Sequence, residues 1–139
     1  MQTTSVDLAP RLRMAIARSA RRLRQEAGTD LSPSLSAALA TVDRFGPLTP
    51  TELAARERVQ RPTITRVICR LEEAGLVTRA ADPADGRSAL ITVSPAGLAL
   101  LAEVRTRKDA FLSERLDALD PQDRATLERA AALLEGMLE

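Results

Sequence analysis

Apolar residues recur through most of the chain at the three- and four-residue spacing of amphipathic helices. Between Leu8 and Glu26 this stripe predicts one helix, which Gly28 ends, and a second helix is expected from Ser34 to Arg44. Towards the other end, Ser-Pro at residues 94–95 and Asp-Pro at residues 120–121 are each expected to begin a helix, the first running to about residue 119. Long helices are therefore expected at both ends of the chain.

The middle of the chain predicts two helices joined by a tight turn. Thr49 is followed by Pro50 and, three residues on, by Glu52, which is the arrangement of a capping box that starts a short helix. Residues 59–62 then lead into a longer helix that ends at Gly75. A short capped helix, a turn and a longer helix in this order predict a helix-turn-helix motif.

After Gly75 the pattern changes to the short alternating segments of β-strands. The segments LVTRA and ALITV flank the turn-forming sequence ADPADGRS, which predicts a hairpin. The expected order of elements is α-α-α-α-β-β-α-α. This is a mainly α fold with a small β-hairpin wing, in which a winged helix-turn-helix lies between terminal helices.

The helix from Arg61 to Gly75 has one apolar face and one polar face whose first half lacks acids. Helical spacing places the expected buried positions at Ile64, Val67, Ile68 and Leu71. A recognition helix in the major groove needs such a non-acidic face, with arginine to pair with guanine and threonine to meet phosphates or a thymine methyl. We assign the guanine contact to Arg66 and expect five neighbours to contact DNA with it: Arg61, Pro62, Thr63, Thr65 and Arg70. The alternative is a solvated face with ordinary surface arginines.

The turn of the hairpin carries Arg87 close to Asp85. An arginine at the tip of a wing can enter the adjacent minor groove, whose negative potential attracts guanidinium groups. Asp85 would then brace Arg87 or the loop. The alternative is plain turn chemistry, because Asp, Pro and Gly all favour turns.

Composition excludes several classes of site. The 139 residues include no histidine and one cysteine, so His-based catalysis, His metal sites, Cys-cluster zinc sites and an internal disulfide are excluded. The sequence has no glycine-rich phosphate loop, and its paired acids lie at a helix end and in a turn. We therefore expect no metal, no cofactor and no enzymatic activity.

Charge is unevenly distributed although the net charge is only +1. Six arginines and no acid lie between Leu8 and Gln25, five arginines and one acid between Ala55 and Arg70, and eight acids and three arginines between Asp109 and Glu139. The first residues lack the apolar run of a signal peptide, and no segment approaches the roughly 18 apolar residues of a membrane span. A cytoplasmic protein without membrane contact is expected.

Residues 48–101 together resemble the winged helix of MarR-type transcriptional regulators. The resemblance rests on the short helix with Leu53 and Ala54, on the entry RPTITR followed by LEEAGLVTR, and on the wing DPADGRSALITVSPAG followed directly by a long helix. The wing of this family usually reads Asp-Arg-Arg. Here Gly86 replaces the middle arginine, which could contact a phosphate, whereas Arg87 is kept.

The resemblance implies a homodimeric regulator, usually a repressor, that binds a pseudo-palindromic operator in double-stranded DNA. Residues 1–30 and 95–139 would form the dimerisation region, and residues 31–94 the DNA-binding domain. The two recognition helices would enter successive major grooves about 34–36 Å apart.

Many regulators of this family release DNA when they bind a small anionic aromatic effector. Phe45 and Phe111 could line such a site here, and Arg18, Arg21 or Arg22 could meet the anion. The alternative is that Phe45 closes a helix end in the core and that the arginines are ordinary surface residues.

Two other functions stay open at this point. Some relatives sense oxidants through a cysteine near the N-terminus, whereas Cys69 here lies on the polar face of the expected recognition helix. The nearby charge of Arg66 would favour its thiolate, and a modified thiol would obstruct the groove. A winged helix can also act as a protein–protein interaction module, although the arginines on the exposed face favour DNA.

Overall fold

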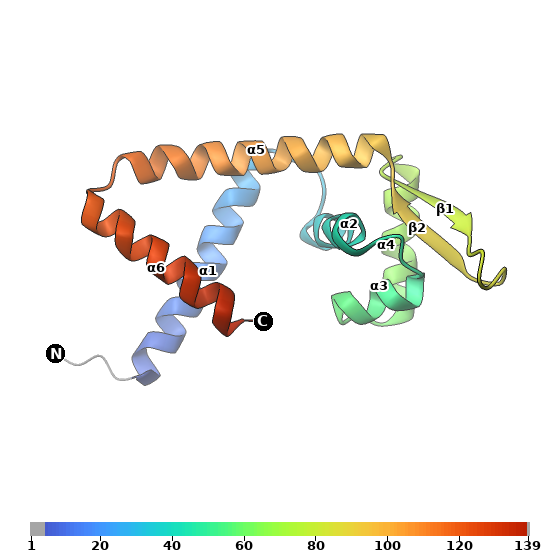
Figure 1. Ribbon diagram of the computed structural model, residues 1–139, viewed down its shortest axis with the longest axis horizontal. Helices are drawn as coiled ribbons and strands as arrows, with labels where there is room; N and C mark the ends of the chain where they lie inside the picture. Colours follow the sequence, from blue (N-terminus) through green and yellow to red (C-terminus); the bar gives the residue numbers. More distant parts are fainter. Residues whose placement is uncertain (1–4, 139) are drawn as a thin grey trace. The chain divides into compact units, whose positions relative to one another are not determined.

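The computed structural model describes residues 5–138, whose elements follow the expected order (Figure 1). The helices and strands are α1 Ser5–Ala27, α2 Pro33–Phe45, α3 Pro50–Glu57, α4 Arg61–Glu73, β1 Val77–Ala81, β2 Ala89–Val93, α5 Pro95–Asp117 and α6 Pro121–Met137. The prediction of a mainly α fold with one β-hairpin is confirmed.

The chain divides into two compact units. Residues 28–105 form one, here called the winged unit. The described residues 5–27 and 106–138 form the other, here called the terminal-helix unit. Helix α5 contributes its first part to the winged unit and the rest, from Thr106 on, to the terminal-helix unit.

The core of the winged unit is formed by α2, α3, α4 and the hairpin. Its largest buried side chains, none more than 2% exposed, are Leu39, Val42, Leu53, Ile64, Ile68, Leu71 and Ile91. The expected buried stripe of α4 is confirmed at three positions, whereas Val67 is only half-buried. Because α4 turns this stripe into the core, its opposite face points outward.

Hydroxyl caps fix where α3 and α5 begin. The Oγ of Thr49 accepts the Glu52 N–H at 3.1 Å, and the Glu52 carboxylate accepts the Thr49 N–H at 3.4 Å, which confirms the capping box. The Oγ of Ser94 accepts the Gly97 N–H at 3.1 Å and donates to the Gly75 carbonyl at 2.6 Å. Ser94 therefore joins the end of the α4 segment to the start of α5.

The hairpin is fixed to the core at its base. Strands β1 and β2 pair antiparallel, with Val77 opposite Val93. Leu48, between α2 and α3, exchanges backbone hydrogen bonds of 3.1 and 2.8 Å with Ile91. Gly75 adopts a φ of 74°, a left-handed conformation that glycine accepts without strain, and so turns the chain from α4 into β1. The hairpin turn projects away from the helices of this unit (Figure 1).

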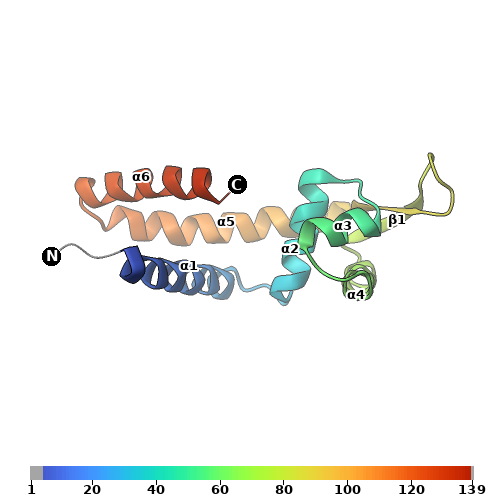
Figure 2. The same ribbon diagram turned by 90° about the horizontal axis from the view of Figure 1, so that it is seen from below.

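In the terminal-helix unit, α5 ends two residues earlier than predicted. Ala118 and Leu119 form a tight turn in which their N–H groups bond to the carbonyls of Arg115 and Leu116 at 3.3 and 3.1 Å. Asp120 precedes a proline and adopts an extended backbone, so the α-helix cannot continue through it. Helix α6 runs back from this turn (Figure 2).

The terminal-helix unit buries little apolar surface. Of residues 7–27 and 106–138, Ala27 alone is buried, and α6 has no buried residue. Its large apolar side chains that are at least 40% exposed are Leu8, Met14, Ile16, Leu112, Leu127, Leu133, Met137 and Leu138. The apolar stripes predicted for the terminal helices are thus left largely open by a single chain.

Candidate nucleic-acid interface

The turn between α3 and α4 is short and fixed by the backbone. Arg58 adopts a left-handed conformation with a φ of 55°, and the Val59 N–H bonds to the Ala54 carbonyl at 3.1 Å. Helix α4 then begins at Arg61, and its N-cap residue Gln60 makes no side-chain cap hydrogen bond. The positive end of α4 is therefore open to an external acceptor.

The outward face of α4 is exposed and basic. In the described part of the chain, Arg61, Arg66 and Arg70 form no ion pair with an acid. All six predicted contact residues belong to α4. Five of them are exposed and Thr63 is half-buried. Cys69 lies exposed on the same face.

The hydroxyl of Thr65 is already engaged within α4. It donates to the Arg61 carbonyl at 2.9 Å and accepts from the Arg61 guanidinium at 3.3 Å. The sequence suggested that this hydroxyl could donate to a phosphate. In the free protein its proton is already used in the bond to Arg61 and is not available for that contact. Its methyl group remains able to make an apolar contact.

The acids of α4 lie in its last turn, as predicted, and one of them is tied to the hairpin. The Oε1 of Glu72 accepts hydrogen bonds from Nε and Nη2 of Arg79 on β1 at 3.3 and 2.9 Å. This charge-assisted contact offsets one of the two negative charges at the end of the helix. It also connects α4 to the base of the wing.

Two aspartates organise the turn of the wing. The Asp82 carboxylate accepts the Ala84 N–H at 2.9 Å, and the Asp85 carboxylate accepts the Arg87 N–H at 3.0 Å. The Asp85 carbonyl also accepts the Ser88 N–H at 3.0 Å. Asp85 thus holds the backbone of Arg87 while the Arg87 side chain is exposed.

Three of the residues expected at an effector site line one cavity in the terminal-helix unit. Arg18, Arg22 and Phe111 surround a space of about 260 Å³, and the Arg22 guanidinium carbon lies 5.4 Å from the centroid of the Phe111 ring. Arg22 also pairs with Glu26 at 2.8 Å.

Phe45, the other aromatic residue expected at the effector site, belongs to the winged unit. Phe45 is 43% exposed, and the Arg56 guanidinium carbon lies 3.8 Å from the centroid of its ring. The alternative that Phe45 closes a helix end inside the core is therefore wrong. An arginine covers one face of the ring, in a cation–π geometry.

The family model described as MarR family matches residues 31–89, from just before α2 to the first residue of β2. An HTH-type transcriptional regulator of Mycobacterium tuberculosis is 38% identical over 140 residues, which cover 100% of this chain and 98% of that protein. The chain belongs to the MarR family. It is accordingly a DNA-binding, helix-turn-helix transcriptional regulator, and its relatives are named as regulators and not as enzymes.

Solved structures agree with this MarR fold. A Pseudomonas aeruginosa protein of known crystal structure is 32% identical, covers 100% of this chain and 99% of its own, and superimposes with a TM-score of 0.88. A mutant of MepR from S. aureus, solved bound to an oligodeoxyribonucleotide, is 17% identical, with coverage of 95% and 98% and a TM-score of 0.72. At that identity the second match shows the fold alone.

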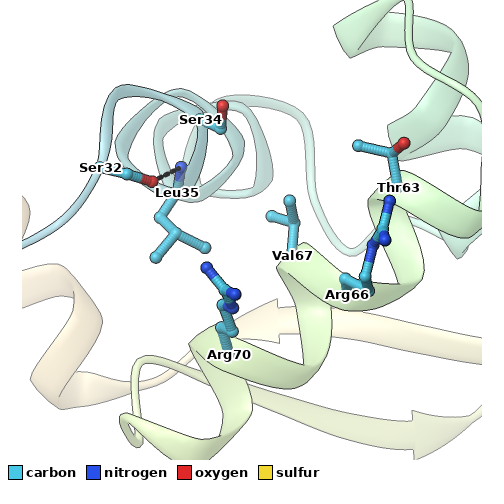
Figure 3. Close-up of a pocket in the computed structure, with 7 residues that line it drawn as sticks. All are labelled: Ser32, Ser34, Leu35, Thr63, Arg66, Val67 and Arg70. Atoms are coloured by element: carbon cyan, nitrogen blue, oxygen red, sulfur yellow. Dashed lines mark hydrogen bonds between the residues drawn. The ribbon is translucent and has the colours of Figure 1, made fainter.

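Within the segment matched by the MarR model, α2 begins at Pro33, one residue before the predicted start, and Ser32 and Ser34 were not among the predicted site residues. Ser32 is the N-cap, with its Oγ accepting the Leu35 N–H at 3.3 Å, and Pro33 follows in the first turn. Ser32 and Ser34 line a cavity together with residues of α4, including Arg70 (Figure 3). The Ser-Pro pair is a visible helix-start signal. That this Ser-Pro pair lies close to α4 is a result of tertiary packing, which no pattern in the neighbouring sequence indicates.

Two structural absences apply to the described residues. Across residues 5–138, no helix combines the length and the apolarity that crossing a bilayer requires. The same residues contain no group of three or more His, Cys, Asp or Glu side chains placed to hold a metal ion.

Proposed function

We propose that this protein is a homodimeric repressor that binds a pseudo-palindromic operator through α4 and the wing. The observation that carries the proposal is the outward face of α4, where Arg61, Arg66 and Arg70 have no acidic partner among the described residues. Their charge is therefore free for phosphates and base edges. An exposed basic face of this kind is what a major-groove helix needs.

Each contact residue has a separate task in this proposal. Arg66 makes the bidentate contact to guanine that the planar guanidinium favours, and the Thr65 methyl meets a thymine methyl. Arg61 and Arg70 contact phosphates on either side, while Pro62 and Thr63 pack against the backbone at the start of the helix.

The wing would add a second point of contact. Arg87 enters the minor groove beside the major-groove site, and Asp85 keeps the turn in shape through its bond to the Arg87 N–H. Gly86 contributes no charge, so the wing reaches the DNA with one arginine.

Dimerisation would cover the apolar side chains that the terminal-helix unit exposes. Eight large apolar residues of this unit are at least 40% exposed, and large exposed apolar areas usually mark an interface. We assign residues 1–30 and 95–139 to the dimer contact and residues 31–94 to DNA binding. Two-fold symmetry then matches a pseudo-palindromic operator, which the dimer would meet in the cytoplasm.

Release by a small anionic aromatic effector is the regulatory part of the proposal. The cavity of about 260 Å³ in the terminal-helix unit offers Arg18 and Arg22 for an anion and the Phe111 ring for stacking. Phe45 belongs to the winged unit and is not part of this cavity. Oxidation of Cys69 is the alternative route, because any group added to this exposed thiol would lie on the groove-facing side of α4.

A DNA titration tests the proposed function directly. Purified protein is titrated against DNA from upstream of its own gene and against unrelated DNA at two salt concentrations. We expect tight, salt-sensitive preference for the upstream fragment, with a log–log slope of about −0.9 per phosphate neutralised. Absence of binding to either DNA at low salt would instead favour a protein-interaction role for the winged helix.

A further inference from the structure

A cavity with arginine, serine and threonine in its lining separates the start of α2 from α4. It has a volume of about 270 Å³ and is open to solvent. Ser32, Ser34 and Leu35 line it from α2, and Thr63, Arg66, Val67 and Arg70 line it from α4 (Figure 3). The lining contains two guanidinium groups and three hydroxyl groups but no carboxylate, so the cavity is suited to an anion.

The donors in this cavity have unused hydrogen-bonding capacity. Arg70 has no acidic partner among the described residues, and in Figure 3 its guanidinium group extends towards α2. Ser34 is exposed, and no hydrogen bond engages its hydroxyl in the part of the chain described. The Ser32 hydroxyl, in contrast, already caps the Leu35 N–H.

The two arginines of the cavity point to different places. Figure 3 shows the Arg66 guanidinium directed towards Thr63, at the leading end of α4, whereas Arg70 lies beside the first turn of α2. A guanidinium group there, added to the positive end of a helix, favours a phosphate more than a neutral base edge. Arg66 is therefore left for base contact, and Arg70 for a phosphate.

We infer that this cavity seats a phosphate group of the DNA backbone, held by Arg70 and Ser34, so that α2 is a second DNA-contacting helix. The inference rests on the proposed DNA contact of α4, because Thr63 and Arg66 belong both to the cavity lining and to that contact face. A duplex on α4 brings its backbone to this cavity. The contact carries no sequence information and fixes the position of α4 in the groove.

Two variants and two matched controls test the contact. Arg70→Ala and Ser34→Ala change the cavity. Arg44→Ala removes the same charge from the last turn of α2, and Ser36→Ala makes the same small change on the same helix outside the cavity lining. Each is titrated against preferred and unrelated DNA over a range of salt concentrations.

For Arg70→Ala we expect about tenfold weaker binding to both DNAs and a salt slope smaller in magnitude by about 0.9. For Ser34→Ala we expect a loss of a few fold on both DNAs with the slope unchanged, because no charge is removed. Both controls should bind as the unaltered protein does. If Arg44→Ala reduces the salt slope as much as Arg70→Ala does, the cavity makes no specific phosphate contact. Both arginines then act through general electrostatic attraction to DNA.

The cavity could bind a free phosphate ion in place of a phosphate group of DNA, so a second experiment is carried out without DNA. Inorganic phosphate is titrated at constant ionic strength while the backbone amide NMR signals of Ser34 and Leu35 are followed. Phosphate could cause saturable shifts that Arg70→Ala abolishes, while the DNA salt slope of that variant stays unchanged. This result would show that the cavity binds free phosphate and not a phosphate group of DNA. If Arg70→Ala changes neither DNA binding nor the response to phosphate, the inference is overturned altogether. If the unaltered protein binds no DNA, the proposed function fails, and the phosphate titration alone decides whether the cavity is an anion site.

Discussion

The Thr65 hydroxyl and Arg61 lie one turn apart at the start of α4 and are joined by two hydrogen bonds. The hydroxyl donates to the Arg61 carbonyl at 2.9 Å, and the Arg61 Nη1 donates back to the hydroxyl at 3.3 Å. Arg61 has no ion pair among the described residues, so this hydrogen bond is what restrains its guanidinium group. Thr65 is thus a positioning residue for Arg61 as well as a candidate base contact.

Substitutions at Thr65 separate these two tasks. Thr65→Val keeps the methyl group and removes the hydroxyl, so we expect binding to weaken by about 1 kcal/mol on every DNA sequence, as the Arg61 contact becomes less ordered. Thr65→Ser keeps the hydroxyl and removes the methyl, so base preference should relax at one position with little general loss. Fluorescence anisotropy with a set of operator variants measures both effects. Equal behaviour of the two variants would contradict the assignment.

Arg66 is expected to carry more specificity than any other side chain of α4. Arg66→Ala should weaken specific binding by about 1–3 kcal/mol and relax base preference at one position per half-site. Arg66→Lys should keep the salt slope but lose the preference, because an ammonium group cannot reproduce the bidentate contact. Competition titrations against operators changed at single positions give the readout. A lysine variant with full preference would show that Arg66 acts through charge alone.

Local signals in the sequence were sufficient to predict the elements of the winged unit. Hydroxyl caps at Thr49 and Ser94, each followed by proline, mark helix starts, and both are caps in the structure. In the terminal-helix unit the carboxylate of Asp120 does the same. The apolar spacing on α4 likewise predicted which face is buried, and hence which face is free. These signals depend on neighbours within four residues, and tertiary context did not override them.

Contacts between distant residues were beyond such reasoning. The Glu72–Arg79 pair, the stacking of Arg56 on Phe45 and the approach of Ser34 to Arg70 depend on how helices pack, which no local pattern encodes. Phe45 illustrates the difficulty, since an aromatic residue at a helix end has equal reason to be core or surface. Here Phe45 is on the surface with arginine as its neighbour.

Ser94 is expected to be important for the stability of the winged unit. It is 7% exposed, and its hydroxyl connects the Gly75 carbonyl to the Gly97 N–H. Ser94→Ala leaves both backbone groups without this partner, so the free energy of unfolding should fall by about 1–3 kcal/mol. Urea unfolding at one fixed protein concentration measures this, since association also affects stability. Ser113→Ala, at an exposed position on α5, is the control and should change the value by less than about 0.5 kcal/mol.

Exposed leucines of α6 should decide the oligomeric state. Leu127 is 47% exposed in the single chain, where a polar residue would be tolerated, but a buried lysine in a dimer contact is costly. Leu127→Lys should therefore shift the protein from dimer to monomer in sedimentation velocity at micromolar concentration. Circular dichroism should show the helices retained. A dimer of undiminished affinity would place the contact on another surface.

Restoring an arginine at Gly86 should strengthen the wing. A Cβ atom added at Gly86 meets no atom within 4 Å, and the φ of Gly86 is not in the left-handed region that favours glycine. Gly86→Arg is therefore accommodated without strain and adds a cation next to Arg87. We expect tighter binding to preferred and unrelated DNA alike, with a salt slope larger in magnitude by about 0.9. Gly86→Ala should leave both quantities unchanged, whereas Arg87→Ala should weaken binding. If Gly86→Arg changes neither affinity nor slope, the tip of the wing does not reach the DNA backbone, and Arg87 is a residue of the turn alone.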